Sequence, residues 1–513
     1  MTLVLVASSQ LQVLLLAAAL DAGLLGPGGR RRVLVLADTS PVPEIGPGLA
    51  SAPAVAAVAG RFDSVVSYND LIAPHRPGSF SPRDSDAPVW ERLIRAAWQL
   101  PDGPVELVVE SVHVDPARSL ATIFPTATIS VHADGLMVYG PTRKALPDDL
   151  ARRLGILVYP DLFVGLRPQL LREHDIRTAA IPLGRVANLV AEVSRVTEAA
   201  GTSVPAGASG LARTAWPTGT SEPGDLAGPH ALVLSQYLAD LGILTRQEED
   251  DLHTAMLDEV VAAGVGRIVV KPHPRATAPT LRAFRRAAEL RGLVCDVAPA
   301  DVLAEVLVVR DRPAVVVGGF STALVTASAL GVADVRAVGT GLVMERLTPY
   351  QNSNRMPLVI VDRLFGTDLR HVAEPSVDEL GRLLEAVAHC MQPTLLPGLR
   401  SSAARLVEAS GTVPWTRYVR RLRAERLGLV DPPGAARASV PGRAAAPGSA
   451  TPRTGAARTA AAGTDAAGTG MAAPPTSHAA PVARTSHPSG TARARRAARG
   501  GLGMRLLSRS RRA

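Results

Sequence analysis

A chain of 513 residues exceeds the size of one ordinary domain, so its length predicts two folded domains with additional sequence. Hydrophobic residues make up 47% of the chain, which is enough for large cores, whereas aromatic residues make up only 3%. So few aromatic side chains argue against a protein that binds nucleic acids by stacking on their bases. Ala, Val and Leu carry the apolar content, as in packed layers of helices on sheets.

The net charge of +9 is concentrated near the C-terminus. Residues 431–513 contain 13 Arg and two acidic residues, a net of +11, which leaves −2 for residues 1–430. The folded part is therefore nearly neutral, and we expect no nucleic-acid partner. For the basic tail we expect either a solubilising extension or weak peripheral contact with an anionic membrane or a polyanionic product.

Two features of the sequence bear on the compartment. Cys295 and Cys390 are too few and too far apart for a disulfide framework or a metal cluster, which fits a reducing environment. The segment Met1–Leu25 is apolar but lacks the basic start of a signal peptide, and two glutamines and Asp21 interrupt it. We expect a buried strand and a helix there, in a cytoplasmic protein that the tail could attach to the inner face of the membrane.

Short Val/Leu/Ile runs alternate with longer Ala/Leu/Arg stretches at helical spacing. This pattern is typical of parallel strands covered by helices on both faces. The first series of expected strands comprises residues 2–7, 33–37, 65–68, 105–109, 127–131 and 156–159. The second comprises residues 231–234, 267–270, 293–297, 314–317 and 335–338. The fold class is therefore α/β, with two Rossmann-like domains.

The two series of strands set the expected domain organisation. A Gly- and Pro-rich stretch separates them, which is typical of a linker. We expect an N-terminal domain at 1–200, a linker at 201–229, and a C-terminal domain at 230–430 that a helix at 415–427 closes. The tail at 431–513 is rich in Ala, Pro, Gly and Arg and lacks a sustained hydrophobic period, so we expect it to be disordered.

The sharpest local signal is a buried strand that runs into a Pro-His-Pro loop. Each proline pushes the preceding residue away from the helical region, so His273 is expected in an extended conformation at the carboxyl end of the strand. Ligands bind at that edge of open α/β sheets. The alternative is a surface turn whose histidine caps nearby backbone. We expect a ligand-binding loop whose candidates are Lys271, His273, Pro274 and Arg275.

A similar pattern follows the strand expected at 314–317, where two glycines precede Ser321 and Thr322. Glycine lets a backbone approach a ligand closely, and hydroxyls beside the free N–H groups of a helix start suit a phosphate. A serine that merely caps the helix is the simpler alternative. Beside the His273 loop, we expect Gly319, Ser321 and Thr322 to bind a phosphate.

In the first domain, the strand at 127–131 leads into Asp134 and Gly135. A carboxylate at a strand end can accept the proton of an attacking hydroxyl, although an ordinary Asp-Gly turn would read the same way. His132 is expected to pack or to hydrogen-bond rather than to catalyse. Further candidates for an acceptor site beside Gly135 are Ser9, Gln10, Glu110, Arg143 and Gln236.

Metal-binding signatures are missing from the sequence, which contains no HExxH, EF-hand or clustered Cys/His spacing. The acidic runs at 148–149 and 248–251 fall at expected helix starts, where carboxylates complement the helix dipole. We therefore expect no metal and no cofactor. A transferase without a metal must neutralise its leaving phosphate with His, Lys, hydroxyls and helix termini.

Taken together, these segments resemble the bacterial sialyltransferases, most of all the alpha-2,8-polysialyltransferase family. The family pattern is two acids before a glycine, a His-Pro pair and a later serine motif, which here are Ala133-Asp134-Gly135, His273-Pro274 and Ser321-Thr322. The resemblance spans roughly residues 2–365. It implies two Rossmann-like domains of the GT-B type that face across a cleft, with an acceptor glycan on the first and CMP-sialic acid on the second.

The resemblance also implies a reaction, the inverting transfer of sialic acid, or a related nonulosonic acid, from CMP to a glycan hydroxyl of a cell-surface polysaccharide. Asp134 would take the hydroxyl proton, and His273 would donate to the leaving phosphate. The family usually has an acid where Ala133 stands, so either Asp134 is the base, or the base comes from elsewhere, or activity is lost. Two other functions stay open, a transferase for another donor such as a CDP-alcohol or UDP-sugar, and a non-catalytic glycan-binding protein.

Overall fold

The computed structural model describes residues 1–40, 48–202, 228–273, 276–299, 301–409 and 411–431. Most of the expected linker and all but the first residue of the expected tail lie outside these ranges. The expected strand–helix pattern at the N-terminus is confirmed by β1 and α1. Within the described ranges, no helix is long and apolar enough to cross a membrane.

The first α/β domain is built on a seven-stranded sheet in which every pairing is parallel. Its central strands β1 and β4 are short runs rich in Val and Leu that are buried on both faces, as parallel strands between helix layers are. The strands are β1 (Thr2–Ala7), β2 (Arg31–Leu36), β3 (Ser64–Ser67), β4 (Val105–Val109), β5 (Thr128–His132), β6 (Leu154–Pro160) and β7 (Arg177–Ile181).

Helices cover both faces of this sheet. Residues of α1, α2 and α7 form one apolar cluster with side chains of β1, β2, β4 and β6, while α4 and α5 pack on the other face. Ser9 caps α1 by accepting a hydrogen bond from the backbone N–H of Gln12. The helices of this half are α1 (Gln10–Asp21), α2 (Pro53–Val58), α3 (Tyr68–Ile72), α4 (Ala87–Ala97), α5 (Ala117–Ile123), α6 (Asp148–Ala151) and α7 (Leu183–Thr202).

The second α/β domain contains a five-stranded sheet, which is also parallel throughout. Its strands are β8 (Ala231–Leu234), β9 (Arg267–Lys271), β10 (Val294–Val297), β11 (Val315–Gly318) and β12 (Val335–Ala337). The helices between them are α8 (Arg246–Ala262), α9 (Ala278–Glu289), α10 (Ala304–Asp311) and α11 (Thr322–Ala329). The expectation of two α/β domains with parallel sheets is therefore confirmed.

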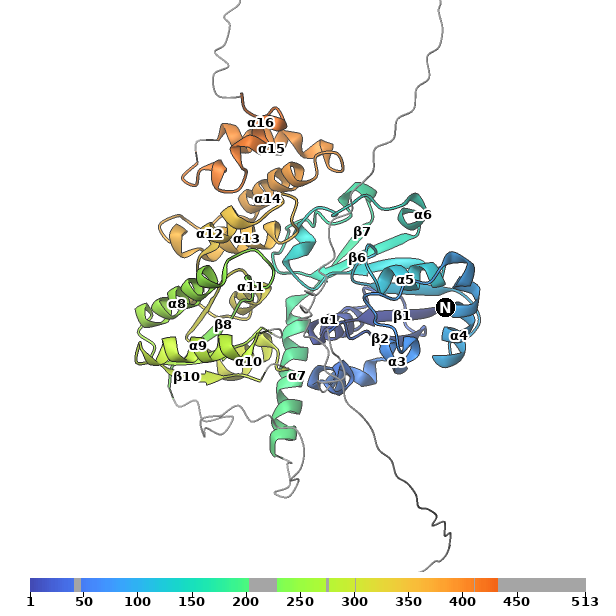
Figure 1. The fold of residues 1–513 in the computed structure, drawn as a ribbon. Helices are drawn as coiled ribbons and strands as arrows, with labels where there is room; N and C mark the ends of the chain where they lie inside the picture. The colour runs from blue at the N-terminus through green and yellow to red at the C-terminus, as the bar shows by residue number, and fades with distance from the viewer. Residues whose placement is uncertain (41–47, 203–227, 274–275, 300, 410, 432–513) are drawn as a thin grey trace, which may run out of the picture. The chain divides into compact units, whose positions relative to one another are not determined.

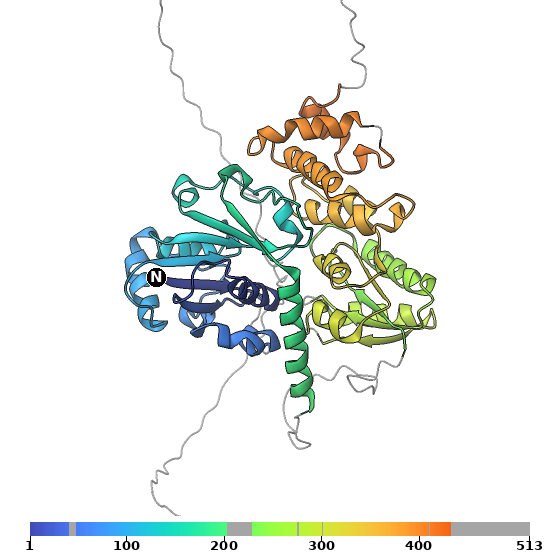
Figure 2. The ribbon, with the colours of Figure 1, turned by 180° about the vertical axis from the view of Figure 1, so that it is seen from behind.

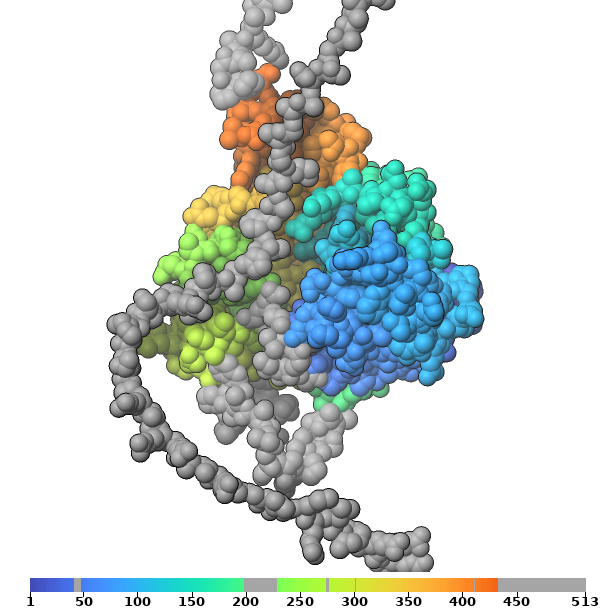
Figure 3. Space-filling view, turned by 45° about the vertical axis from the view of Figure 1, so that its right-hand side comes forward, coloured from blue at the N-terminus to red at the C-terminus, as the bar shows by residue number. Residues whose placement is uncertain are grey.

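The two domains contact each other within one compact unit. Helix α7 packs against α1 and α2 of the first domain and against α10 of the second, and both ribbon views show it between the two sheets (Figures 1 and 2). The space-filling view shows the surfaces of the two domains meeting (Figure 3). Beyond β12 the chain continues as α12 (Thr340–Arg346), α13 (Arg355–Phe365), α14 (Val377–Met391), α15 (Arg400–Glu408) and α16 (Arg421–Arg426).

The order of the strands determines where a ligand can bind. The first sheet has the order β3-β2-β1-β4-β5-β6-β7, and the second has the order β10-β9-β8-β11-β12. Each order reverses at one point, between β1 and β4 in the first sheet and between β8 and β11 in the second. The connections leave in opposite directions at such a point, which opens a crevice at the carboxyl ends of the strands.

Three details differ from the sequence-based expectation. Strand β7 was not predicted, because its Arg-Thr-Ala-Ala-Ile sequence is short and only weakly apolar. Tyr68 was expected to end a strand but starts α3, since Ser67 caps that helix through the backbone N–H of Asp70. The single closing helix expected at 415–427 is wrong, because a 3₁₀ turn (Trp415–Arg417) and the short helix α16 occupy this stretch.

The C-terminal helices depend on a buried arginine at the start of α13. Arg355 is 1% exposed, and its guanidinium donates to the carbonyl oxygens of Tyr350 (Nε, 2.8 Å) and Leu347 (Nη2, 2.8 Å). The same guanidinium lies 4.3 Å from the centre of the Tyr350 ring. Without it, the Tyr350 carbonyl would lose its donor, and the Leu347 carbonyl would keep only the hydrogen bond from Arg420 Nη2 (3.2 Å).

We expect Arg355→Leu to lower the free energy of unfolding by about 1–3 kcal/mol, because the buried Tyr350 carbonyl left without a donor loses the compensation for its desolvation. Urea unfolding followed by circular dichroism would measure the loss. The control is Arg363→Leu on the same helix, whose guanidinium donates to the Ala373 carbonyl in an exposed contact and whose loss should cost less than about 0.5 kcal/mol. Equal losses in both variants would contradict this role of Arg355.

Candidate active site at the edges of the two sheets

Three polar residues of the first domain follow neighbouring strands of its sheet, and two of them, Glu110 and Asp134, are predicted site residues. Ser8 comes directly after β1, Glu110 directly after β4, and Asp134 two residues after the neighbouring strand β5. Because these strands are parallel neighbours, their carboxyl ends meet at one edge of the sheet. The fold thus brings Glu110 and Asp134, which are 24 positions apart in sequence, to the same place.

A buried glutamine connects these side chains. Gln12, only 3% exposed, accepts hydrogen bonds at Oε1 from the backbone N–H of Ser8 (2.8 Å) and from its hydroxyl (3.1 Å). These two donors fix the orientation of the amide, so its NH₂ group points away from Ser8. Gln12 Nε2 donates to Asp134 Oδ2 (3.0 Å), and the Gln12 side chain also hydrogen-bonds the carboxyl group of Glu110.

The charge of Asp134 affects the proton affinity of Glu110. The pKa of Glu110 is raised, first because the surrounding protein desolvates its carboxylate and second because the charge of Asp134 repels it. Hydrogen bonds from Gln12 and Ser8 oppose this shift. Glu110 is nevertheless exposed to solvent, with its Oε2 3.4 Å from the Ser8 hydroxyl. It is thus a carboxyl group with an elevated proton affinity that a ligand can reach.

In the second domain, the predicted histidine lies at the carboxyl edge of the sheet, one strand away from the point between β8 and β11 where the strand order reverses. His273 comes two residues after β9, and its backbone N–H donates to the hydroxyl of Ser235, the residue that follows β8 (3.0 Å). The imidazole stacks on the ring of Tyr237, with the ring centres 3.7 Å apart and the planes at 28°. Both the backbone and the ring plane of His273 are therefore held by the loop after β8.

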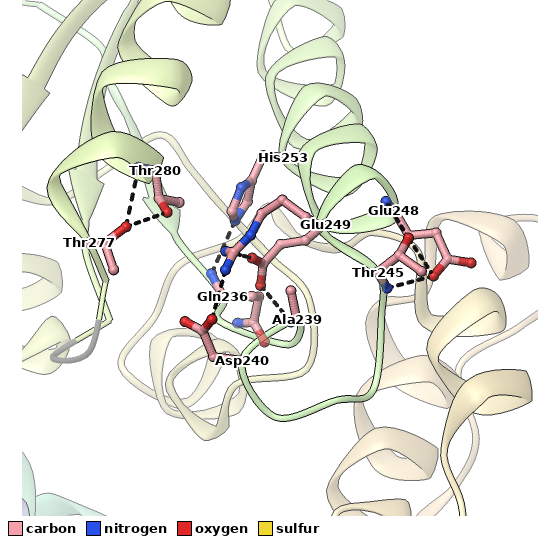
Figure 4. A network of polar contacts seen from close by, with 10 residues as sticks. Gln236, Ala239, Asp240, Thr245, Glu248, Glu249, His253, Thr277 and Thr280 are labelled. Carbon is pink, nitrogen blue, oxygen red and sulfur yellow. Dashed lines mark hydrogen bonds and ion pairs between the residues drawn. The ribbon is translucent and has the colours of Figure 1, made fainter. Parts of the chain in front are cut away.

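That loop is itself fastened to α8 by a polar network (Figure 4). His253 Nε2 accepts the backbone N–H of Gln236 (3.3 Å), and Glu249 accepts that of Ala239 (3.2 Å). Burial lowers the pKa of His253 to about 4, so its imidazole is neutral near pH 7 and can accept this hydrogen bond. Arg246 joins Glu249 (3.0 Å) to Asp240 (2.7 Å). The network holds the segment that carries Tyr237.

Lys271, at the end of β9, lies in a mixed electrostatic environment. Burial lowers its pKa, while the charges of Asp301 and Glu305 act in the opposite direction. Glu305 is buried at the start of α10, and burial raises its pKa, with a further contribution from Asp134. Asp134 of the first domain therefore lies within electrostatic reach of Glu305 in the second.

The serine motif of the second domain touches the acidic motif of the first. Ser321 Oγ accepts the backbone N–H of Ala323 (3.2 Å), so Ser321 is the N-cap of α11. Thr322 Oγ1 lies 3.5 Å from the backbone N of Leu136, and a β-carbon placed on Gly135 would come within 2.7 Å of that oxygen. The glycine after Asp134 is thus required by the close packing of α11.

The remaining predicted residues occupy different places. Gln10 Nε2 donates to the backbone oxygen of Asp301 (2.6 Å) and so bridges the domains, whereas the Ser9 hydroxyl is used as a helix cap. Gln236 belongs to the second domain, where a β-carbon on Gly319 would lie 3.1 Å from its side chain. Arg143 is exposed, and its charge acts on His113. Pro274 and Arg275 lie outside the described residues.

His132 packs inside the first domain, as expected. It is 2% exposed, and its Nε2 is 2.9 Å from the carbonyl oxygen of Val6. In the described part of the chain, no group of three or more His, Cys, Asp or Glu side chains is arranged to hold a metal ion.

Sequence reasoning missed two residues that organise the site, Gln12 and Tyr237. A glutamine within the apolar stretch Leu11–Ala19 was a usable signal, since a buried amide in an apolar helix needs hydrogen-bond partners. Tyr237 carried no such signal, because its stacking on His273 depends on the pairing of β8 with β9.

The chain was compared with protein families, with curated proteins and with solved structures. A model of the alpha-2,8-polysialyltransferase (POLYST) family matches residues 3–333, which is more than half of the chain. A sequence search found no match among curated proteins.

The similar solved structures include a sialyltransferase from Photobacterium damselae, with 12% identity and a TM-score of 0.35 over 71% of this chain and 96% of that one. A 2,6-sialyltransferase from Photobacterium sp. JT-ISH-224, in a ternary complex with CMP and lactose, has 14% identity and a TM-score of 0.37 over 70% of this chain and 76% of that one. The UDP-GlcNAc 2-epimerase from Neisseria meningitidis has 7% identity and a TM-score of 0.39 over 84% and 99%.

The residues that match the family model include both the Asp134 and the His273 segments. The chain therefore belongs to the alpha-2,8-polysialyltransferase family and is a glycosyltransferase.

Proposed function

We propose that the protein transfers sialic acid, or a related nonulosonic acid, from a CMP-activated donor to a glycan hydroxyl in a single inverting displacement without a metal ion. The observation that carries this proposal is the meeting of the two motif-bearing edges. Thr322 of the serine motif lies against Gly135 of the acidic motif. The chain that makes this contact belongs to a family of glycosyltransferases. Groups suited to a leaving phosphate and groups suited to a proton acceptor are therefore neighbours.

In the proposed reaction, the acceptor hydroxyl attacks the anomeric carbon and loses its proton to a carboxylate at the ends of β4 and β5. In the family pattern this role belongs to an acid of the acidic motif, of which this chain keeps Asp134 but not the acid at position 133. On the opposite side, the bond from the anomeric carbon to the phosphate oxygen breaks, and His273 donates a proton or a hydrogen bond to that oxygen. Lys271 and the hydroxyls at the start of α11 stabilise the phosphate charge.

The fold prepares His273 for this role before a substrate arrives. Its backbone is tied to Ser235, its ring is stacked on Tyr237, and the loop of Tyr237 is fixed to α8. Groups that are already oriented toward the developing charge need no reorganisation in the transition state, which is the main source of such electrostatic stabilisation.

The donor is tested by calorimetry with CMP, CDP and UDP, followed by turnover of CMP-sialic acid with an oligosaccharide acceptor. We expect CMP to bind more tightly than UDP, and product to form at an undiminished rate in the presence of EDTA. Tighter binding of the uridine nucleotide would contradict the sialyl assignment. Binding of glycan without turnover of any nucleotide-sugar would instead indicate a non-catalytic protein.

The leaving-group role of His273 predicts that His273→Ala lowers kcat by about 10²- to 10³-fold, because one pre-oriented donor to the developing charge is lost. Steady-state kinetics with CMP-sialic acid would measure this loss. CMP affinity and the melting temperature, recorded beside it, separate a catalytic defect from misfolding. A variant that retains more than about a third of the wild-type kcat would contradict the assignment.

The stacking of Tyr237 on His273 predicts that the ring matters and the hydroxyl does not. Tyr237→Ala should lower kcat by about 2- to 10-fold, the range that corresponds to one aromatic contact of about 0.5–1.5 kcal/mol. The matched control Tyr237→Phe keeps the ring and should retain wild-type kcat. Equal losses in both variants would show that the hydroxyl, and not the stacking, is what His273 needs.

A further inference from the structure

The acidic motif of this chain lacks one acid, because Ala133 stands where the family pattern has a carboxylate before Asp134. The structure places another carboxylate beside this motif. Glu110 follows β4, the strand that pairs with β5 in register from Glu106 opposite Thr128 to Val109 opposite Val131. It also lies at the switch point of the sheet, because β1 and β4 are the neighbours between which the strand order reverses.

Gln12 and Ser8 hold Glu110 and Asp134 as a pair. The Gln12 amide donates to Asp134 Oδ2 at 3.0 Å and hydrogen-bonds Glu110, while its oxygen is occupied by the backbone N–H of Ser8 at 2.8 Å. The Ser8 hydroxyl is placed between Gln12 Oε1 (3.1 Å) and Glu110 Oε2 (3.4 Å). Because a buried amide with its oxygen engaged can offer only N–H groups, the geometry selects two acceptors at these positions.

The two members of the pair differ in access. Glu110 is exposed, whereas Asp134 is half-buried beside the contact between Gly135 and Thr322. A general base must come within hydrogen-bond distance of the hydroxyl proton, so the exposed member is the better placed of the two.

We propose that Glu110 is the catalytic base of this protein, in place of the acid missing at position 133, and that Asp134 and Gln12 position it. This inference rests on the proposed function. In the step, the O–H bond of the acceptor breaks and its proton passes to a Glu110 carboxylate oxygen. The oxygen's electron pair forms the bond to the anomeric carbon, and the bond from that carbon to the phosphate oxygen breaks, with its electrons leaving on CMP.

Charge supports the same assignment. A carboxylate that lies beside a carboxyl group raises its proton affinity, and the pKa of Glu110 is raised by burial of its carboxylate and by the charge of Asp134. A base with a raised pKa accepts a proton more readily in the transition state. As the pH falls through that pKa, Glu110 becomes protonated and the activity it supports disappears.

The test uses the full-length protein with CMP-sialic acid and an oligosaccharide acceptor, once wild-type turnover has been established. If the wild type does not turn over this donor, the proposed function fails and the role of Glu110 falls with it. If the wild type is active, Glu110→Gln should lower kcat by about 10²- to 10⁴-fold with CMP affinity unchanged within about twofold, since an isosteric amide cannot accept the proton. Retention of more than about a third of wild-type kcat would overturn the assignment.

A second variant separates chemistry from structure. Glu110→Ala leaves space for a small carboxylate, so added formate should restore activity at least tenfold in a concentration-dependent way. The acidic limb of the wild-type kcat/KM profile, expected above the ordinary glutamate value of 4.5, should be missing from Glu110→Gln. The absence of rescue in a folded protein that still binds CMP, together with an unchanged acidic limb in the Gln variant, would overturn the proposal.

The matched control is Asp161→Asn. Asp161 follows β6, so it is a carboxylate at the same edge of the same sheet, next in order after the ends of β4 and β5. Its substitution should leave kcat and the pH profile unchanged within about twofold, with no effect of formate. A loss equal to that of Glu110→Gln would mean that any acid at this edge supports activity nonspecifically, which would also overturn the proposal.

Discussion

Gly135 lies so close to the first residue of α11 that a β-carbon in its place would come within 2.7 Å of Thr322 Oγ1. This approach joins the carboxyl edge of the first sheet to the serine motif of the second domain, and the rest of the site is arranged around it. Asp134 precedes the contact, Ser321 caps the helix that makes it, and Gln10 bridges the same two domains through Asp301. The acidic and serine motifs lie close enough to act in one reaction because the Thr322 side chain packs against the backbone of Gly135 and Leu136.

Several carboxyl groups lie around this contact. A negatively charged donor can bind beside them only if some of these groups are protonated. Lys271 is the cation at the end of β9, and Asp301 and Glu305 lie near it, with Asp134 and Glu110 across the domain boundary. Burial raises the pKa of Glu305, and the Asp134 charge adds to this shift. Glu305 therefore binds a proton more readily than an ordinary glutamate. In its neutral form, such a group does not repel a carboxylate or phosphate that approaches Lys271.

The sequence was informative where one strand ends and the next loop begins. The Val/Leu/Ile runs predicted the parallel strands, because full burial leaves such runs almost without polar residues. The Pro-His-Pro loop and the Asp-Gly turn marked the ends of β9 and β5, each one strand away from the point where the strand order reverses. What the sequence could not provide is which strands are neighbours. The pairing of Glu110 with Asp134 and of Tyr237 with His273 depends on the order β1-β4-β5 and on the neighbours β8 and β9.

The local environment of position 133 explains why an alanine stands there and why a carboxylate is better placed elsewhere at this edge of the sheet. Ala133 is 8% exposed and belongs to the apolar core of the first domain, and its backbone N–H donates to the Val158 carbonyl. A carboxylate confined there would have to be desolvated among apolar neighbours, at a cost that a methyl group avoids. Glu110, in contrast, is exposed and already supplied with hydrogen bonds by Gln12 and Ser8. A carboxylate at the end of β4 can thus serve the same edge of the sheet without placing a charge in the core.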